Sequence, residues 1–384
     1  MGWYPQSLVT DETLIAKLNK AGGEWVSYGY YSGTGKADGN MKPGDFMKYK
    51  DVLFNGSKYR AVTFTEYRPA VIYKERNEDS SHQSENGYSV NQVYWFRFDP
   101  IVWDVLDPAK GLVVCHAVLD GQPYNNTIFE KEGVYYQNAS CTNYANNYRE
   151  SSIRKWLKEE FYRTAFSSAQ QALLQETRLD YLSQPPCTKY DSGNCVDKVF
   201  FLSRKEVLNK DYGFDWAHLQ ADDARTAKAS EYAKCQGLYV YKNPNPVVVM
   251  NGNASYITVT AGEPSDSSNE FFSVDFYGYV LASGMSEVVT GVRPACLLDP
   301  NAQIVQCKVE EVGTAKSAPA GDVDGDGKVS SADARLALRA SVGLEKYAKG
   351  SAQFTAADAD KDGKITSADA RLILRASVGL EKLS

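Results

Sequence analysis

Acidic residues near the end of the chain recur at a spacing that suits a divalent cation. Residues 322–333 and 358–369 each carry aspartate at loop positions 1, 3, 5 and 12, and glycine at position 6. A hard cation takes about six to eight oxygen ligands, and glycine permits the tight turn that makes carboxylates converge. The pattern predicts two calcium ions, with the ligands Asp322, Asp324, Asp326, Lys328 and Asp333 in one loop and Asp358, Asp360, Asp362, Lys364 and Asp369 in the other. The two lysines would act through their backbone carbonyl oxygens.

The two loops belong to an internal duplication. Residues 322–346 and 358–382 are identical at 20 of 25 aligned positions, which is far above chance and marks a repeated structural unit. Apolar residues recur at helical spacing after each loop, so we expect one helix in each copy. These helices should end at Gly343 and Gly379, because glycine readily adopts the left-handed conformation that terminates a helix.

The segments before the loops contain residues that break helices. Pro319 and Gly321 precede the first loop, and Gly350 precedes the second. An EF-hand has a helix on both sides of its calcium loop, so we expect each copy to be a loop followed by a single helix. Residues 309–320 are small and polar, which is typical of a linker, and they divide a domain at 1–308 from a module at 321–384.

Duplicated calcium loops without entering helices resemble a type I dockerin, the module that attaches extracellular proteins of anaerobic bacteria to cohesin modules of scaffoldin proteins. The likeness covers Gly321 to Ser384. Both loops close with aspartate, as dockerin loops usually do, whereas calcium-sensor loops close with glutamate. The resemblance implies that the cohesin contacts Ser331, Ala332, Arg335 and Arg339 in the first copy and Ser367, Ala368, Arg371 and Arg375 in the second.

The duplication and the acidic loops lead to two further expectations for this module. Because both copies present the same contact residues, the module should have an approximate two-fold axis and offer either copy to one cohesin. Without metal, the carboxylates of each loop repel one another, and so small a domain has little core to resist them. Calcium binding should therefore be coupled to folding.

Residues 1–308 mix helix and strand signals, which predicts a large irregular α+β domain followed by a small all-α module. Asp11 precedes an apolar stripe that predicts a short helix, and Asn55-Gly56 predicts a hairpin between strands at 50–54 and 58–64. We expect a helix at 151–161, capped by Asn147 and Glu150, and another opened by Ser167 and Gln170. Further strands are predicted at 92–98, 101–106, 112–119, 199–202, 247–250, 256–260 and 288–292.

A set of aromatic and apolar strings gives this region a second resemblance. The strings are Trp3 to Gln6, Pro100 to Trp103, Tyr148, Ser152 to Leu157, Phe161-Tyr162, Ala165-Phe166, Phe200 to Ser203 and Gly291 to Pro294. They resemble a domain of unknown function that recurs in extracellular proteins of gut anaerobes and is related in pattern to C-type-lectin-like folds. The resemblance implies a shared core and assigns no catalytic residue.

Residues 1–308 contain no nucleophile elbow, zinc-protease motif or phosphate loop, so whether the chain is an enzyme stays open. Asp104 with Asp107 is one acid pair that fits a glycosidase, but the sequence does not distinguish it from surface carboxylates. Glu263 to Asp266 faintly resembles a sugar-binding loop but fits a turn better. Five tyrosines on expected loops are candidates for stacking on sugars, although aromatic residues also build cores: Tyr28, Tyr30, Tyr31, Tyr135 and Tyr136.

Composition limits the class of protein. The net charge of -6 argues against a nucleic-acid partner, and the longest apolar runs are only a few residues, so no membrane span is expected. Met1 runs directly into a segment without signal-peptide character, so we expect a trimmed signal or a fragment. Cys187 and Cys195 flank a polar loop where either a disulfide or two free thiols would be ordinary.

These patterns favour an extracellular, secreted component of a cellulosome-like complex that degrades polysaccharides. Its dockerin would bind the cohesin of a scaffoldin, and residues 1–308 would bind glycan or a cell surface. Two alternatives stay open. In the first, residues 1–308 are a carbohydrate-active hydrolase, because dockerins commonly carry catalysts. In the second, the calcium loops serve a sensor or buffer.

Overall fold

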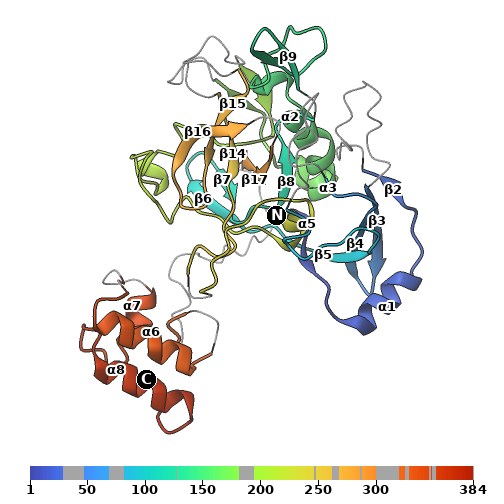
Figure 1. Ribbon diagram of the computed structural model, residues 1–384. Coiled ribbons are helices and arrows are strands. Elements are labelled where there is room, and N and C mark those ends of the chain that lie inside the picture. Colours follow the sequence, from blue (N-terminus) through green and yellow to red (C-terminus); the bar gives the residue numbers. More distant parts are fainter. Residues whose placement is uncertain are drawn as a thin grey trace. The chain divides into compact units, whose positions relative to one another are not determined.

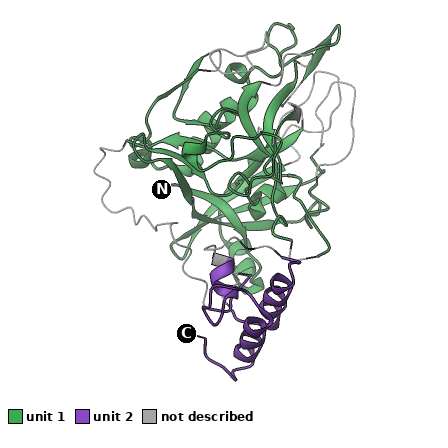
Figure 2. Cartoon of the chain, turned by 90° about the vertical axis from the view of Figure 1, so that its left-hand side faces the viewer, with its two compact units in different colours: residues 1–303 green, residues 304–384 purple. Residues whose placement is uncertain are grey.

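The computed structural model describes residues 1–28, 47–68, 82–126, 128–180, 194–245, 248–261, 268–285, 288–299, 320–324, 328–345, 347 and 352–383. The chain forms two compact units, a first unit of Met1–Gln303 and a second unit of Ile304–Ser384 (Figure 2). The predicted linker at 309–320 lies outside the described residues apart from Ala320. Among the described helices, none has the length and apolar character that crossing a membrane requires.

An antiparallel sheet at the start of the first unit confirms the predicted hairpin (Figure 1). In sheet order its strands are β1 (Trp3–Leu8), β5 (Tyr94–Pro100), β4 (Ser57–Phe64), β3 (Met47–Phe54) and β2 (Val26–Ser27). Asn55 and Gly56 join β3 to β4 with φ of 50° and 79°, as a tight hairpin turn requires. The predicted helix is α1 (Glu12–Lys20), and the Asp11 side chain caps it.

Two further sheets build most of the first unit. One has the order β16 (Val280–Met285), β15 (Glu270–Val274), β14 (Tyr256–Ala261), β17 (Val289–Val292) and β8 (Asp120–Pro123). The other has the order β13 (Val199–Phe200), β18 (Ala295–Leu297), β7 (Leu112–Cys115) and β6 (Trp103–Asp107). Of these pairings only β14 with β17 is parallel, so the expected α+β class is confirmed.

The segment after Asn147 is more broken than predicted. It forms η1 (Tyr148–Glu150), α2 (Ser152–Trp156), the π-helix η2 (Leu157–Phe161), α3 (Tyr162–Ala165) and α4 (Ser168–Gln171). Asn147 caps the short η1, whereas the extended backbone of Ser151 starts a new helix whose cap is the Ser151 side chain. The capping box of Ser167 and Gln170 is confirmed, but α4 ends after a single turn.

Smaller elements complete the first unit. They are the hairpin β9 (Phe129–Lys131) with β10 (Val134–Tyr136), the pair β11 (Thr177–Leu179) with β12 (Cys195–Asp197), η3 (Lys210–Tyr212) and α5 (Glu231–Cys235). The strand predicted at 247–250 is wrong for its described residues, which form a turn after 248. Val249 is 75% exposed there, so an apolar run alone did not indicate burial.

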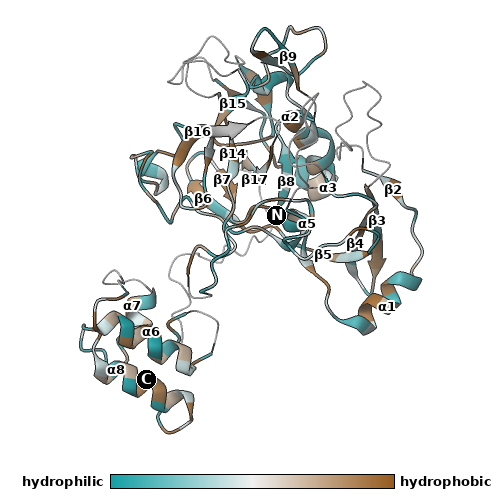
Figure 3. Cartoon of the chain, in the orientation of Figure 1, coloured by the Kyte–Doolittle hydropathy of each residue, from teal (hydrophilic) through white to brown (hydrophobic). Residues whose placement is uncertain are grey.

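The described residues of the second unit form three helices, α6 (Ser331–Ser341), α7 (Ala352–Ala357) and α8 (Ser367–Ser377). Its small core includes Ala337 and Ile373, which are fully buried. Gly343 and Gly379 follow α6 and α8 with φ of 76° and 74°, which confirms the predicted helix ends. Polar and apolar residues are interspersed along α6 and α8 (Figure 3).

The prediction that no helix enters either loop is wrong for the second copy. Helix α7 ends at Ala357, directly before the second loop begins at Asp358. Gly350 lies ahead of this helix and therefore does not interrupt it. The second loop thus has a short helix on its entering side, as an EF-hand does.

Candidate functional site

The first acidic loop gathers three of its predicted ligands. Carboxylate oxygens of Asp322, Asp324 and Asp333 lie within 4.8 Å of one another. Asp322 and Asp333 are almost fully buried, with 2% and 0% exposed. Two charges at this distance repel by roughly 3 kcal/mol at an effective dielectric constant of about 20, so the group suits a cation. Asp326, the predicted ligand at position 5, lies outside the described residues.

The second loop gathers Asp358, Asp360 and Asp362, whose carboxylate oxygens also lie within 4.8 Å of one another. Asp358 Oδ2 accepts a hydrogen bond from the Gly363 backbone N–H (2.9 Å). Asp358 Oδ1 is buried and has no hydrogen-bond partner among the described residues. A buried oxygen of this kind is costly unless something binds it, and a calcium ion in the loop would satisfy it.

Charge repulsion is already visible at Asp360. A hydrogen bond from the Asp362 backbone N–H lowers the pKa of the Asp360 carboxyl, but desolvation and the charges of Asp369, Asp362 and Asp358 outweigh it. The net result is a pKa above the ordinary aspartate value. The neighbouring carboxylates therefore disfavour the ionised form of Asp360, and a cation bound in the loop would offset this repulsion.

The aspartates that close the loops also organise the backbone. Asp333 Oδ1 accepts the backbone N–H groups of Val323 (2.8 Å) and Asp324 (3.1 Å). Asp333 Oδ2 accepts the backbone N–H and the hydroxyl of Ser330. In the second copy, Asp369 makes the corresponding bonds to Asp360 and Thr366. Position 12 thus fastens each loop to the first turn of the following helix.

The residues at loop positions 7 and 9 occupy equivalent places in both copies. Lys328 and Lys364 are both exposed. Ser330 and Thr366 cap α6 and α8, because their hydroxyls accept the backbone N–H of the residue two positions ahead. These hydroxyls therefore serve the capping box.

All eight residues predicted to meet a partner are at least partly accessible. Ser331, Arg335, Ser367, Arg371 and Arg375 are exposed, and Ala332, Arg339 and Ala368 are half-buried. Arg339 Nε lies 2.9 Å from Glu345 Oε1, and Arg375 Nε lies 3.1 Å from Glu381 Oε2. The matching ion pairs hold the two arginines in equivalent positions on α6 and α8.

Sequence reasoning missed a set of apolar residues beside these arginines. Leu338 and Leu374 are each 47% exposed, and the leucines and valines after them are more so. The full set is Leu338, Val342 and Leu344 in the first copy and Leu374, Val378 and Leu380 in the second. The sequence did indicate these residues, because the same apolar residue types occur at equivalent positions in both copies and lie outside the buried face of each helix.

The acid pair that suited a glycosidase is engaged in separate ion pairs. Asp104 Oδ1 lies 2.9 Å from His116 Nδ1, and Asp104 Oδ2 lies 3.2 Å from Arg293 Nη2. Asp107 lies 2.8 Å from Lys110 Nζ. Charged partners already compensate both carboxylates.

The tyrosines and the cysteine pair singled out in the sequence have mixed outcomes. Tyr28 is 1% exposed, and its hydroxyl accepts the indole N–H of Trp156 (2.9 Å), so a sugar-stacking role is wrong for it. Tyr136 stacks on Tyr144 with ring centroids 5.5 Å apart. Four of the predicted features lie outside the described residues, namely Tyr30, Tyr31, Cys187 and Glu263 to Asp266.

A cluster of partly exposed aromatic side chains lies elsewhere on the first unit. This aromatic cluster consists of Tyr239, Tyr241, Phe276, Tyr277 and Tyr279. The rings of Tyr241 and Phe276 stack at 5.0 Å, and Phe276 meets Tyr277 at 4.5 Å. Asp275 holds the turn by accepting the Tyr277 backbone N–H (2.8 Å), and the Asn243 side chain donates to the Tyr241 hydroxyl (3.2 Å).

Two family models match parts of the chain. Residues 320–376 match the family model described as Dockerin type I domain, and residues 124–300 match the one described as Domain of unknown function (DUF6273). The predicted resemblances to a type I dockerin and to a domain of unknown function are thereby confirmed. No curated protein and no solved structure matches the chain.

Proposed function

Because the chain carries a type I dockerin domain, we propose that it is an extracellular component of a cellulosome-like complex that degrades polysaccharides. Its second unit would bind the cohesin module of a scaffoldin in a calcium-dependent manner. The observation that carries this proposal is the pair of acidic loops, each fastened to a helix that presents the same accessible residues. Calcium sensing is the alternative, and capture of a cohesin separates the two roles.

Each loop would hold one calcium ion. The predicted ligands are the five residues of each loop named from the spacing, and the unpartnered Asp358 Oδ1 supports an ion in the second. Calcium titration by calorimetry should give two sites per chain. Pull-down of a cohesin panel should succeed with calcium and fail with excess chelator. Capture that persists in chelator would refute calcium-dependent docking.

The duplication supports two equivalent binding modes. Arg335→Ala with Arg339→Ala removes one set of contacts, and Arg371→Ala with Arg375→Ala removes the other. Each double variant should lower cohesin affinity only about twofold, because one of two equivalent modes remains. The quadruple variant, with all four arginines replaced, should lose at least tenfold in cohesin affinity, since charged contacts are each worth about 1.5–3 kcal/mol. Loss of binding in a single double variant would contradict the dual mode.

The exposed leucines and valines on α6 and α8 would form the apolar part of the same contact. An interface core is depleted of charge and enriched in large apolar groups. Leu338→Ala combined with Leu374→Ala should therefore weaken cohesin binding without unfolding the module, because neither side chain belongs to its core. Helix content by circular dichroism in calcium serves as the control measurement.

The first unit would bind glycan through the aromatic cluster, on a fold related in pattern to C-type lectins. Partly exposed aromatic rings flanked by an amide offer apolar faces and hydrogen bonds together, which is what a sugar ring presents. Affinity electrophoresis on plant polysaccharides and starch tests this. Tyr241→Ala should abolish retardation, whereas Tyr136→Ala, at a stacked pair outside the cluster, should not. Absence of retardation on every polysaccharide would refute the proposal.

A further inference from the structure

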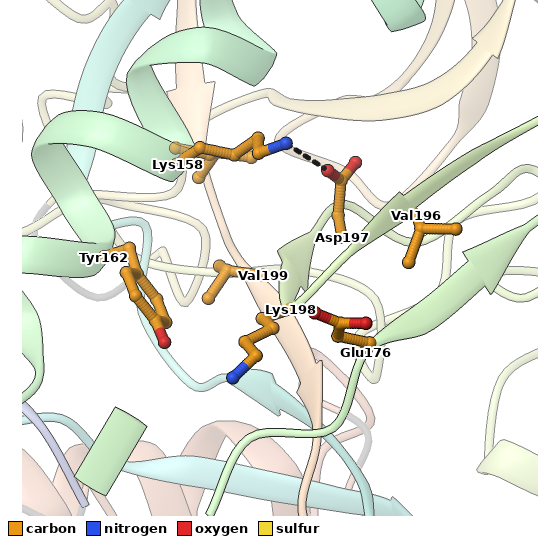
Figure 4. A pocket seen from close by; sticks show the side chains of 8 residues that line it. Lys158, Tyr162, Glu176, Val196, Asp197, Lys198 and Val199 are labelled. Atoms are coloured by element: carbon orange, nitrogen blue, oxygen red, sulfur yellow. Dashed lines mark ion pairs between the residues drawn. The ribbon is translucent and has the colours of Figure 1, made fainter. Parts of the chain in front are cut away.

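A pocket of about 460 Å³ lies in the first unit beside the π-helix η2. Its lining residues are Leu157, Lys158, Tyr162, Glu176, Val196, Asp197, Lys198 and Val199, and Figure 4 shows their side chains. The volume falls in the usual range for small-molecule sites. None of these residues belongs to the aromatic cluster, so the pocket is a separate feature.

The pocket combines an apolar floor with a fixed buried charge. Leu157 and Val199 are buried. The Asp197 side chain is 0% exposed, and Arg154 Nε donates to both of its oxygens at 3.1 and 2.8 Å. Lys158 Nζ reaches toward the same carboxylate from 3.6 Å (Figure 4). Because Arg154 already compensates Asp197, the half-exposed Lys158 retains charge that a ligand can use.

Lys198 supplies a second positive charge. Its Nζ lies 3.4 Å from the Gln171 carbonyl oxygen, and the Tyr162 hydroxyl lies 3.5 Å from the same oxygen. Both hydrogen bonds are long, so both groups have bonding capacity to spare. Glu176 is the remaining carboxylate of the lining. With Arg154 and Asp197 balanced, two lysines face one glutamate, and the pocket carries an excess positive charge.

The local helix geometry brings these groups together. Lys158 lies in η2, and Tyr162 begins α3 directly after it. Both line the pocket, four residues apart along the widened turn. A π-helix is rare and often marks a functional site, because its extra residue per turn costs stability. Lys158 and Lys198 reach the pocket from the helix and from the strand connection opposite.

We propose that this pocket binds an acidic sugar unit, which is an inference that rests on the proposed glycan-binding role of the first unit. A sugar carboxylate would pair with the lysine ammonium groups. Sugar hydroxyls would donate to Glu176, and the less polar ring face would lie against Tyr162 and Val199. A neutral sugar would offer the two lysine ammonium groups no negative charge to pair with, so the pocket selects acidic units.

Calorimetry on the full chain tests the pocket directly, with galacturonate and galactose as probes. Galacturonate should bind more tightly than galactose. Lys198→Ala and Lys158→Ala should each lower the affinity for galacturonate roughly 10- to 100-fold, since each removes a charge-assisted hydrogen bond. Lys155→Ala is the matched control, because Lys155 is exposed on the neighbouring α2 outside the pocket. Lys198→Arg keeps the charge and should retain most of the affinity.

Three outcomes would overturn the inference. Galacturonate could fail to bind at millimolar concentration, bind no better than galactose, or bind the lysine variants as well as the wild type. If neutral polysaccharides still retard the chain, and Tyr241→Ala abolishes this while Lys198→Ala does not, the pocket inference falls and glycan binding stands. If no polysaccharide retards the chain and no uronate binds, both fall.

Discussion

A carboxyl group buried in the first unit should make its stability depend on pH. Asp120 is 0% exposed. It accepts hydrogen bonds from the Tyr4 hydroxyl (2.6 Å), the Gly121 backbone N–H (2.7 Å) and Gln122 Nε2 (3.1 Å). Burial outweighs these bonds and raises the pKa of the carboxyl from 3.8 to about 6. Asp120→Asn is the perturbation that isolates this group.

The sign follows from proton binding. Between pH 3.8 and about 6, the folded state holds the Asp120 proton more tightly than the unfolded chain does. The free energy of unfolding therefore falls as pH rises through this window. The rise in pKa from 3.8 to about 6 corresponds to about 3 kcal/mol. The unfolded carboxyl is already partly ionised at pH 4, so wild type should lose about 2 kcal/mol of this relative to Asp120→Asn between pH 4 and pH 7.

Asparagine preserves the local contacts, so the comparison is clean. Its oxygen can accept from Gly121 and Gln122, and its amide can donate to the Tyr4 hydroxyl oxygen. The assay is urea unfolding followed by tryptophan fluorescence at several pH values. All six tryptophans lie within residues 3–216, so the signal reports the first unit alone. A wild-type minus variant difference that stays constant from pH 4 to pH 7 would refute the reasoning.

Three further predictions concern other sites. Asp51→Asn should destabilise the first unit by about 2–4 kcal/mol at pH 7, because it removes the carboxylate that lies 2.7 Å from the buried Arg60. Burial alone would raise the pKa of Asp51, but Arg60 and Lys58 lower it overall. The stability difference between wild type and variant, measured by fluorescence, should therefore shrink in acid. Gly321→Ala should destabilise the second unit by about 1–3 kcal/mol in calcium, since the φ of Gly321 is +97° and an added Cβ would lie 2.4 Å from Leu383 Cδ1. Unfolding followed by circular dichroism should show a smaller loss of stability for Gly343→Ala, because no atom lies within 4 Å of a Cβ added there. Asp358→Asn should remove one calcium site in calorimetry and leave the other, and two unchanged sites would contradict the ligand assignment.

The local features of this protein were predictable because their determinants lie close together in the chain. The Asn55-Gly56 hairpin, the Asp11 cap and the helix ends at Gly343 and Gly379 each depend on a few neighbouring residues. The acidic clusters are also local, since the ligands of one loop span twelve positions. Helix α7 was missed because Gly350 was interpreted as a breaker inside the segment, although the helix begins after it.

Features that depend on distant residues were not predictable. Tyr28 was expected on a loop, yet its hydroxyl lies in the core and accepts hydrogen bonds from Gln122 and Trp156. Strand β8 (Asp120–Pro123) carries little strand signal, and its pairing with β17 makes it a strand. Propensity is a weak guide for such a segment because cross-strand packing decides its conformation.

The sequence by itself determined the duplicated acidic loops, the helices that follow them and the dockerin type I domain at residues 320–376, because spacing within a short segment is enough to converge carboxylates. Only the tertiary structure decided which acids are compensated, which aromatic rings reach the surface and where a pocket opens. Asp197 is buried and paired with Arg154 across 43 residues, and Lys198 lines the same pocket as Lys158. Charge and exposure at such places are set by neighbours that only folding brings together.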